Sequence, residues 1–143
     1  MSPRFLSMGE VLLILQDQIR RYGGSYGVRD VELLSSALAM PQTTFGGRYL
    51  HADLFEQAAA YAYHLCQNHP FHDGNKRVAL ASALVFLDLN GVELTDPEGK
   101  LYRLMMEVSV GRKKKEHIAK AFRELSAQRP IKKKRKPGKP GES

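Results

Sequence analysis

The sequence of 143 residues lacks several features that would place it in a special class of protein. Its one cysteine, Cys66, cannot form an internal disulfide, which fits a chain that works in a reducing cytosol. Its longest apolar run, residues 78–87 interrupted only by Ser82, has half the length that a bilayer crossing requires. No apolar segment precedes Glu10, so we expect no secretory signal. These absences predict a cytoplasmic chain with no membrane-spanning segment.

The composition is that of an ordinary globular protein. Hydrophobic residues make up 43% of the chain and charged residues 26%, which argues against a disordered or fibrous chain. The length suits one domain that buries about two thirds of its unfolded surface. We therefore expect residues 1–128 to fold as a single domain that needs no disulfide or metal for stability.

The positive charge is concentrated at the C-terminal end. Residues 129–143 contain seven basic residues and one acidic residue, Glu142, so they carry +6 of the formal net charge of +7. A segment rich in Lys, Pro and Gly cannot bury apolar surface, which predicts a disordered basic tail at 129–143. Counterion release would let this tail contact nucleic acid or an acidic partner. A solvated terminus is the simpler interpretation.

Periodic apolar residues and capping signals predict a protein built from helices. Ser7 and Glu10 form a capping box in front of a stripe of apolar residues at helical spacing. No internal repeat and no alternation of strands with helices is present. The expected helices run from 7 to 22, from the cap Asp30 to Pro41, from the cap Asp53 to near Asn68, from Asn75 or Lys76 to Asn90, from the cap Asp96 with Pro97 as first residue past Val108, and around 118–125.

Two further segments complete the predicted fold. Residues 78–89 are apolar on nearly every side, which is typical of a central helix surrounded by others. Residues 42–50 contain Gly46-Gly47 and predict a loop or a small hairpin. Pro70 disfavours the α conformation at His69, so we expect extended backbone there. The fold class is therefore all-α with at most one small hairpin.

The stretch 69–77 brings together the residue types that phosphate chemistry needs. It reads His-Pro-Phe-His-Asp-Gly-Asn-Lys-Arg and opens the buried helix. A helix N-terminus presents unpaired N–H groups and a partial positive charge, so it favours anions. Gly74 lets a phosphate approach the backbone, and Lys76 and Arg77 add positive charge. The segment therefore predicts a phosphate site.

Three other residues of this loop have expected roles. Asp73 can supply a carboxylate oxygen to a Mg²⁺ that bridges phosphates. His69 can accept the proton of an attacking hydroxyl, a role worth roughly 10²- to 10⁴-fold in rate. Phe71 is apolar between two polar flanks and is expected to anchor the loop in the core.

The pattern over residues 69–77 resembles the signature of the Fic/Doc family, in the form seen in death-on-curing toxins. The likeness extends over about residues 5 to 126 and includes Tyr22-Gly23-Gly24, the Phe45-Gly46-Gly47 segment and residues 53–56. The resemblance implies a Fic-like helical bundle around a central buried helix, and modification of a hydroxyl on a target protein with ATP and Mg²⁺. It assigns His69 as the base, Asp73 as the metal ligand, residues 42–50 as the flap that aligns the target, and a phosphate cradle of Gly74, Asn75, Lys76 and Arg77.

Two departures from the family pattern favour one branch. Members that transfer AMP carry Gly at the position of Lys76 and a second Arg at the position of Leu80. Doc-like toxins share both changes, and the resemblance implies that they pass the γ-phosphate of ATP to translation elongation factor Tu. We therefore favour phosphoryl transfer over AMP transfer. The inhibitory glutamate motif of some members has no counterpart here, so we expect a separate antitoxin protein.

Two other classes of function remain as alternatives. His72-Asp73, with His51, His64 and His69, could hold a divalent ion as in an HD-type phosphohydrolase. A non-catalytic helical module could instead contact nucleic acid through residues 112–115 and the basic tail. Taken singly, His72 is expected to face solvent and His64 to lie on a helix face, with His51 and His117 at the surface.

Overall fold

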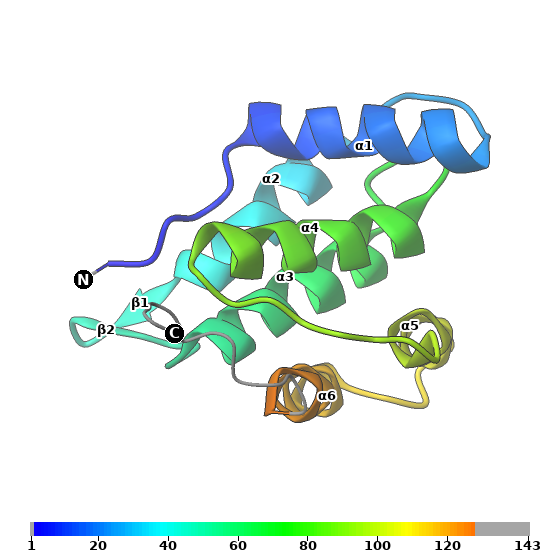
Figure 1. Ribbon diagram of the computed structural model, residues 1–143. Helices are drawn as coiled ribbons and strands as arrows, with labels where there is room; N and C mark the ends of the chain where they lie inside the picture. The colour runs from blue at the N-terminus through cyan, green and yellow to red at the C-terminus, as the bar shows by residue number, and fades with distance from the viewer. Residues whose placement is uncertain (1, 128–143) are drawn as a thin grey trace, which may run out of the picture.

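The computed structural model describes residues 2–127, so residue 128 and the predicted basic tail at 129–143 lie outside the described residues. Six helices dominate the described chain, which confirms the all-α class (Figure 1). No helix in this part of the chain is long and apolar enough to cross a membrane. The elements are α1 (Met8–Tyr22), α2 (Val31–Ala39), the 3₁₀ turn η1 (Met40–Gln42), β1 (Thr44–Phe45), β2 (Arg48–Tyr49), α3 (Leu54–Asn68), α4 (Asn75–Leu89), α5 (Lys100–Ser109) and α6 (Lys115–Ala127).

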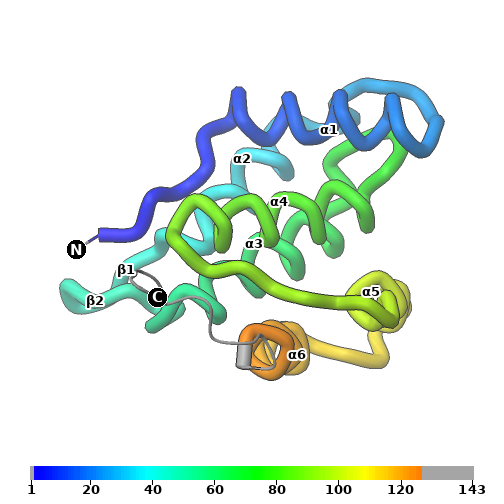
Figure 2. The backbone as a smooth tube through the Cα atoms, in the orientation of Figure 1, coloured from blue at the N-terminus to red at the C-terminus, as the bar shows by residue number. Residues whose placement is uncertain are grey.

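Helix α3 is the structural centre of the molecule. It packs against α2, α4, α5 and α6, and its side chains Tyr61 and Leu65 are fully buried. In Figures 1 and 2, α1 and α4 lie across the view, while α5 and α6 are seen close to end-on below them. The apolar pattern of residues 78–89 predicted that this helix is surrounded by others, but α4 contacts α1, α3 and α5 and leaves Val85 and Leu89 exposed. The more enclosed helix is therefore α3.

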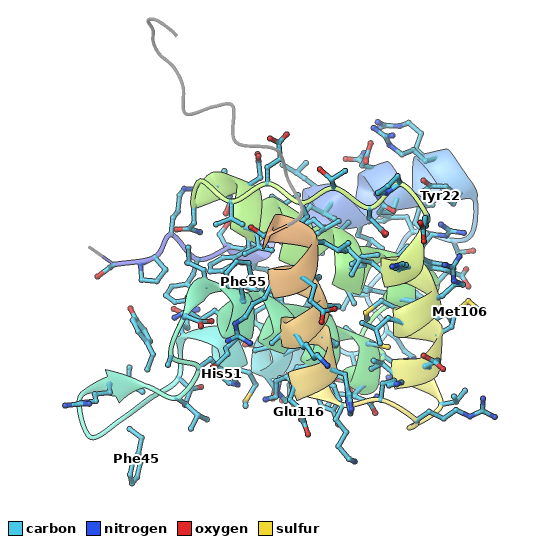
Figure 3. The ribbon with its side chains drawn as sticks, turned by 60° about the horizontal axis from the view of Figure 1, so that its bottom comes forward. Tyr22, Phe45, His51, Phe55, Met106 and Glu116 are labelled. Atoms are coloured by element: carbon cyan, nitrogen blue, oxygen red, sulfur yellow. The ribbon has the colours of Figure 1, made fainter. Side chains whose placement is uncertain are left out.

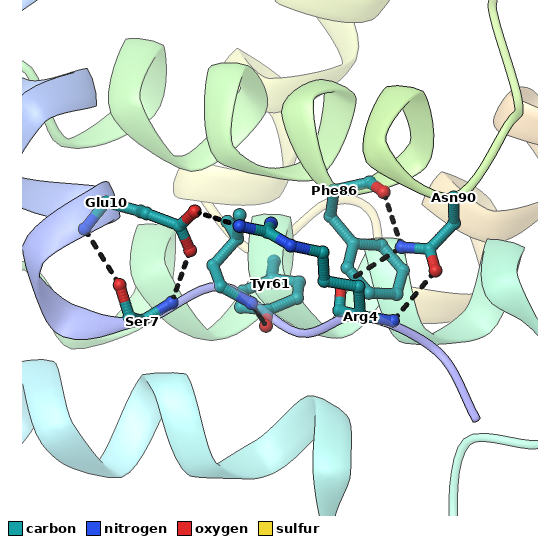
Figure 4. A network of polar contacts seen from close by, with 7 residues as sticks. Arg4, Ser7, Glu10, Tyr61, Phe86 and Asn90 are labelled. Carbon is teal, nitrogen blue, oxygen red and sulfur yellow. Dashed lines mark hydrogen bonds and ion pairs between the residues drawn. The ribbon is translucent and has the colours of Figure 1, made fainter.

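The N-terminal segment is fastened to the bundle by a network of polar contacts (Figure 4). The predicted capping box is present, since Ser7 and Glu10 bond each other's backbone N–H. Asn90, at the end of α4, accepts from the N–H of Arg4 at 2.8 Å and donates to its carbonyl at 3.1 Å. Tyr61 accepts from the Leu6 N–H at 2.8 Å, and burial raises the pKa of this phenol to about 12.

The predicted hairpin forms between η1 and α3. Thr44 pairs with Tyr49 and Phe45 with Arg48, in antiparallel register. The two turn residues Gly46 and Gly47 have φ of 60° and 79°, as expected of the type I′ turn that fits the twist of a two-residue hairpin. Phe45 is 84% exposed at the tip, and Figure 3 shows its ring away from the rest of the molecule.

Helix α5 begins later than the sequence indicated. Its first residue is Lys100, where we expected a start at Pro97 after the cap Asp96. Gly99 has a φ of 68°, which ends the preceding turn in the left-handed region and delays the helix. The Asp96 carboxylate still caps the helix, because it accepts from the N–H groups of Lys100 at 2.9 Å and Leu101 at 3.0 Å.

Candidate functional site

The loop between α3 and α4 is held by backbone bonds to the segment between α1 and α2. The Pro70 carbonyl accepts from the N–H groups of Arg29 at 2.7 Å and Asp30 at 3.1 Å. The His72 N–H donates to the Gly27 carbonyl at 3.1 Å. These bonds run alongside a β-bridge between the two segments, so the loop is braced although it contains no regular structure.

His69 ends α3 in a conformation that the sequence did not predict. Its φ of 48° and ψ of 53° are left-handed, where we expected extended backbone before Pro70. A left-handed residue often ends a helix, and here the Arg29 side chain stabilises the turn by hydrogen bonds. The Arg29 Nε donates to the His69 carbonyl at 2.8 Å, and its Nη2 donates to the Asn68 carbonyl at 3.1 Å. The His69 side chain is exposed.

Phe71 and Asn75 fix the middle of the loop. Phe71 is 1% exposed, as expected of an anchor in the core. The side-chain amide of Asn75 accepts from the Phe71 N–H and donates to the Phe71 carbonyl, both at 3.0 Å. The Asn75 side chain therefore closes the loop, and no acceptor is recorded for its backbone N–H within residues 2–127.

Asp73 is oriented by the glycine-rich end of α1. Its Oδ2 accepts from the Ser25 N–H at 2.7 Å. A Cβ at Gly24 would lie 2.9 Å from the Asp73 Cβ, so only glycine permits this close approach. The second oxygen, Oδ1, has no recorded hydrogen-bond partner among the described residues, which leaves it available to a cation.

The first turn of α4 has no side-chain cap. Its N-cap is Gly74, with φ of 81°, and no acceptor for the N–H groups of Asn75, Lys76 and Arg77 is recorded within residues 2–127. A cavity of about 350 Å³ lies against this turn, a volume typical of small-ligand sites. Its wall consists of Gln18, Ile19, Tyr22, Gly23, Gly24, Asp73, Gly74, Asn75, Lys76, Arg77 and Tyr102.

The cavity wall favours an anion. It contains two cations, Lys76 and Arg77, and one carboxylate, Asp73. For neither cation is an ion pair recorded in the described part of the chain. Five of the six predicted site residues, 73 to 77, therefore meet at this cavity, while His69 lies outside its wall at the far end of the loop.

Arg77 is held by two aromatic rings that the sequence did not single out as site residues. Its guanidinium carbon lies 3.9 Å from the centre of the Tyr22 ring and 4.5 Å from that of Tyr102. Cation–π contacts cover the faces of the guanidinium and leave its in-plane N–H groups free to donate. Tyr22 precedes the Gly23-Gly24 signal, whereas Tyr102 comes from α5 and had no signal in the sequence.

The ligand set of the hydrolase alternative is not brought together. His51 and His64 both contact Lys115 near α6, whereas His72 packs against Gly27. No group of three or more His, Cys, Asp or Glu side chains within residues 2–127 is placed to hold a metal. His51 also corrects a prediction, because it is 6% exposed and not at the surface. The contact with α6, which lies far along the chain, covers it.

Comparisons with known proteins agree with the resemblance that the loop carries. A match to the Fic/DOC family covers residues 5–87, more than half of the chain. The chain therefore belongs to the Fic/DOC family.

Two relatives show the extent of the likeness. The chain is 47% identical over 73 residues to the protein named Toxin Doc of Mycolicibacterium smegmatis, a match that covers 51% of this chain and 56% of that protein. It is 37% identical over 93 residues to the protein named Protein kinase doc of Escherichia phage P1, which covers 65% of this chain and 73% of that protein. The chain thus spans little more than half the length of the first relative.

Proposed function

We propose that this chain is a Doc-like toxin that transfers a phosphoryl group from ATP to a Ser or Thr hydroxyl of a target protein. One relative is named as a toxin and another as a protein kinase, which supports a protein-modifying activity. The target we propose is elongation factor Tu, and we propose a separate antitoxin protein as the partner that silences the chain.

The observation that supports the proposal most directly is the open first turn of α4. Three backbone N–H groups without a recorded acceptor, next to Gly74, can donate to phosphate oxygens. Lys76 supplies a point charge, and Arg77 supplies a planar set of donors that its two ring contacts keep in one orientation. The whole arrangement lines one cavity.

The residues present also fit a hard cation. Asp73 has one oxygen occupied by Ser25 and the other without a recorded partner, and carboxylate oxygen is the ligand that Mg²⁺ prefers. A Mg²⁺ bound there would neutralise part of the phosphate charge. His69, exposed at the other end of the loop, can take the proton of an incoming hydroxyl.

The position of Leu80 favours phosphoryl transfer over AMP transfer. Leu80 stands where AMP-transferring relatives of the family pattern have a second Arg. It packs against the apolar core and lines a different cavity, together with Leu84 and Val92. Within residues 2–127, Arg77 is the one arginine that lines the α4 cavity, so phosphates bound there would have a single bidentate partner.

The test uses ATP labelled at one phosphate at a time. The chain is incubated with Mg²⁺ and purified elongation factor Tu, once with γ-labelled and once with α-labelled ATP. We expect label on a Thr or Ser from the γ position only. His69→Ala should lower the rate by roughly 10²- to 10⁴-fold, whereas His117→Ala, at another exposed histidine, should leave it unchanged.

Each other outcome changes a different part of the proposal. Label from α-labelled ATP would assign AMP transfer. Label on another protein in a bacterial extract, with none on elongation factor Tu, would refute the target alone. An unlabelled extract together with undetectable ATP binding would refute the transferase. For the antitoxin, growth arrest on expression should be relieved by the gene product encoded beside it, and absence of relief would refute that partner.

A further inference from the structure

His69 is held in a backbone conformation that few residues other than glycine adopt. Within residues 2–127 it is the only non-glycine residue with a positive φ, which is 48°. The left-handed region places the Cβ of an L-residue close to the following carbonyl oxygen, and Pro70 further restricts the residue in front of it. A residue stays in such a conformation only where its surroundings fix it. Contacts from elsewhere in the chain must therefore hold His69.

Arg29 supplies these contacts. Its backbone N–H donates to the Pro70 carbonyl at 2.7 Å. Its side chain donates to the His69 carbonyl from Nε, at 2.8 Å, and also from Nη2. The same Nη2 donates to the Asn68 carbonyl at 3.1 Å. A single residue thus satisfies three successive carbonyls at the end of α3, where carbonyls lack a partner inside the helix.

The recorded side-chain contacts of Arg29 are confined to this turn. No ion pair of Arg29 is recorded within residues 2–127. The neighbouring Asp30 carboxylate caps α2, because it accepts from the Leu33 N–H at 3.0 Å. Arg29 is also absent from the wall of the α4 cavity. Its guanidinium therefore acts on the turn that carries His69 and not on the cavity that we propose binds ATP.

The imidazole of His69 depends on this turn for its orientation. The side chain is exposed, and no hydrogen bond of either ring nitrogen is recorded among the described residues. In many active sites a third group bonds the base and orients it. Here the backbone angles of His69, which set the direction of its Cα–Cβ bond, take over that task.

The rest of the loop is held without the Arg29 side chain. The His72 N–H donates to the Gly27 carbonyl at 3.1 Å, and Val28 and Phe71 form a β-bridge. Arg29 itself is exposed. Removal of its side chain should therefore release the turn at His69 without opening the core.

We propose that Arg29 is a positioning residue, which keeps the His69 backbone left-handed and thereby points the exposed imidazole toward the hydroxyl that is phosphorylated. The inference rests on the proposed function, in which His69 takes the proton of that hydroxyl. Without the Arg29 side chain the turn relaxes to a negative φ, and the imidazole moves out of its reacting position. A displacement of about 1 Å in such a group can cost roughly 10²-fold in rate.

The first measurement is structural and needs no substrate. NMR scalar couplings across the N–Cα bond report the φ of His69 in the wild-type chain and in Arg29→Ala. We expect a positive φ in the wild type and a negative φ in the variant. The matched control is Arg20→Ala, since Arg20 is also exposed and has no recorded side-chain hydrogen bond or ion pair within residues 2–127. This control should keep the φ of His69 positive.

The second measurement is catalytic and uses the same variants with γ-labelled ATP. We expect Arg29→Ala to lower kcat by roughly tenfold to 10²-fold. The KM for ATP, and the ATP affinity measured by calorimetry with Mg²⁺, should stay unchanged because Arg29 does not line the α4 cavity. Arg20→Ala should match the wild type in all three quantities.

A second substitution keeps the test decisive if Arg29→Ala fails to melt as a folded protein. Arg29→Lys retains the charge but cannot present the planar set of donors, so its kcat should lie between those of Arg29→Ala and the wild type.

The proposal is overturned if His69 keeps a positive φ in the folded variants, if they transfer phosphate at the wild-type rate, or if ATP affinity falls as much as kcat. If the wild-type chain transfers no phosphate, the proposed function fails, and the φ measurement alone decides whether Arg29 sets the backbone of His69.

Discussion

The first turn of every helix has backbone N–H groups without a partner in the helix. The starts of α3 and α4 treat these groups in opposite ways. At the start of α3, the Asp53 side chain accepts from the Glu56 N–H at 2.8 Å. The Arg123 guanidinium pairs with the carboxylates of both Asp53 and Glu56. At the start of α4, Gly74 offers no side chain and Lys76 has no recorded partner in the described chain. Where the protein satisfies its own groups, it gains stability. Where it leaves them open, these groups stay available to a ligand.

The largest effect on stability should come from Phe71, which anchors the loop in front of α4. Phe71→Ala removes a ring that is 1% exposed, so the free energy of unfolding should fall by about 3–5 kcal/mol. Phe45→Ala is the matched control, because that ring is 84% exposed and should change stability by less than about 0.5 kcal/mol. Urea denaturation measures both, and equal effects would contradict the burial of Phe71.

Removing a carboxylate from each start should separate stability from activity. Asp53→Ala loses the cap and the ion pair with Arg123, so we expect about 1–2 kcal/mol less stability at pH 7 with transfer activity kept. Asp73→Asn should keep stability within about 1 kcal/mol, because the amide oxygen can still accept from Ser25, and should abolish Mg²⁺-dependent transfer. Urea denaturation and ATP labelling are measured on both variants. A loss of activity in Asp53→Ala together with a loss of stability in Asp73→Asn would refute the contrast between the two helix starts.

The Asp53 contribution should also disappear in acid. Burial alone would raise the pKa of Asp53, but Arg123 and the Glu56 N–H outweigh it and lower this pKa. A carboxyl with a lowered pKa in the folded state stabilises above its unfolded pKa, and the stabilisation is lost as the pH falls through the folded value. Wild type and Asp53→Ala should therefore differ at pH 7 and converge as the pH falls below the ordinary pKa range of an aspartic acid.

A smaller effect is expected at the rings around Arg77. Tyr102→Ala removes one cation–π contact worth about 0.5–1 kcal/mol, so ATP should bind roughly two- to fivefold more weakly. Tyr102→Phe keeps the ring over the guanidinium and should restore the affinity. Calorimetric titration with ATP and Mg²⁺ measures both variants, and an equal loss in Phe would assign the effect to the hydroxyl.

The smallest effect on stability should come from an exposed ion pair on the surface of α1. Arg21 contacts Asp17 at 2.9 Å within α1, and both side chains are largely exposed. Arg21→Gln should change the free energy of unfolding by about 0.5 kcal/mol or less. A loss of several kcal/mol in the same urea titration would mean that surface pairing, and not burial, sets the stability of this chain.

Local signals predicted much of the fold and part of the site. The caps Ser7, Asp30 and Asp53 placed the starts of three helices, and Gly46-Gly47 placed the hairpin. The sequence also predicted that residues 73 to 77 lie together, and all five line the α4 cavity. Residues so close in sequence necessarily lie close in space. The roles assigned to them stay predictions.

Long-range contacts account for what the sequence did not reveal. Arg29 reaches the His69 carbonyl across 40 positions, and Lys115 reaches His64 across 51. No periodicity or short motif records such pairs, because they form only when the helices pack. From the sequence, residues 112–115 suggest a nucleic-acid contact, whereas the fold places Lys115 between two imidazoles.

The brace between the two loops has a mechanical consequence. Ser25 holds the carboxylate of Asp73, and Arg29 holds the carbonyl of His69, so one short strip of chain grips both ends of the loop. A macromolecule that bound this strip and shifted it by an ångström would pull the proposed base and the proposed metal ligand out of alignment together. The chain could then be switched off from outside, with its cavity left empty.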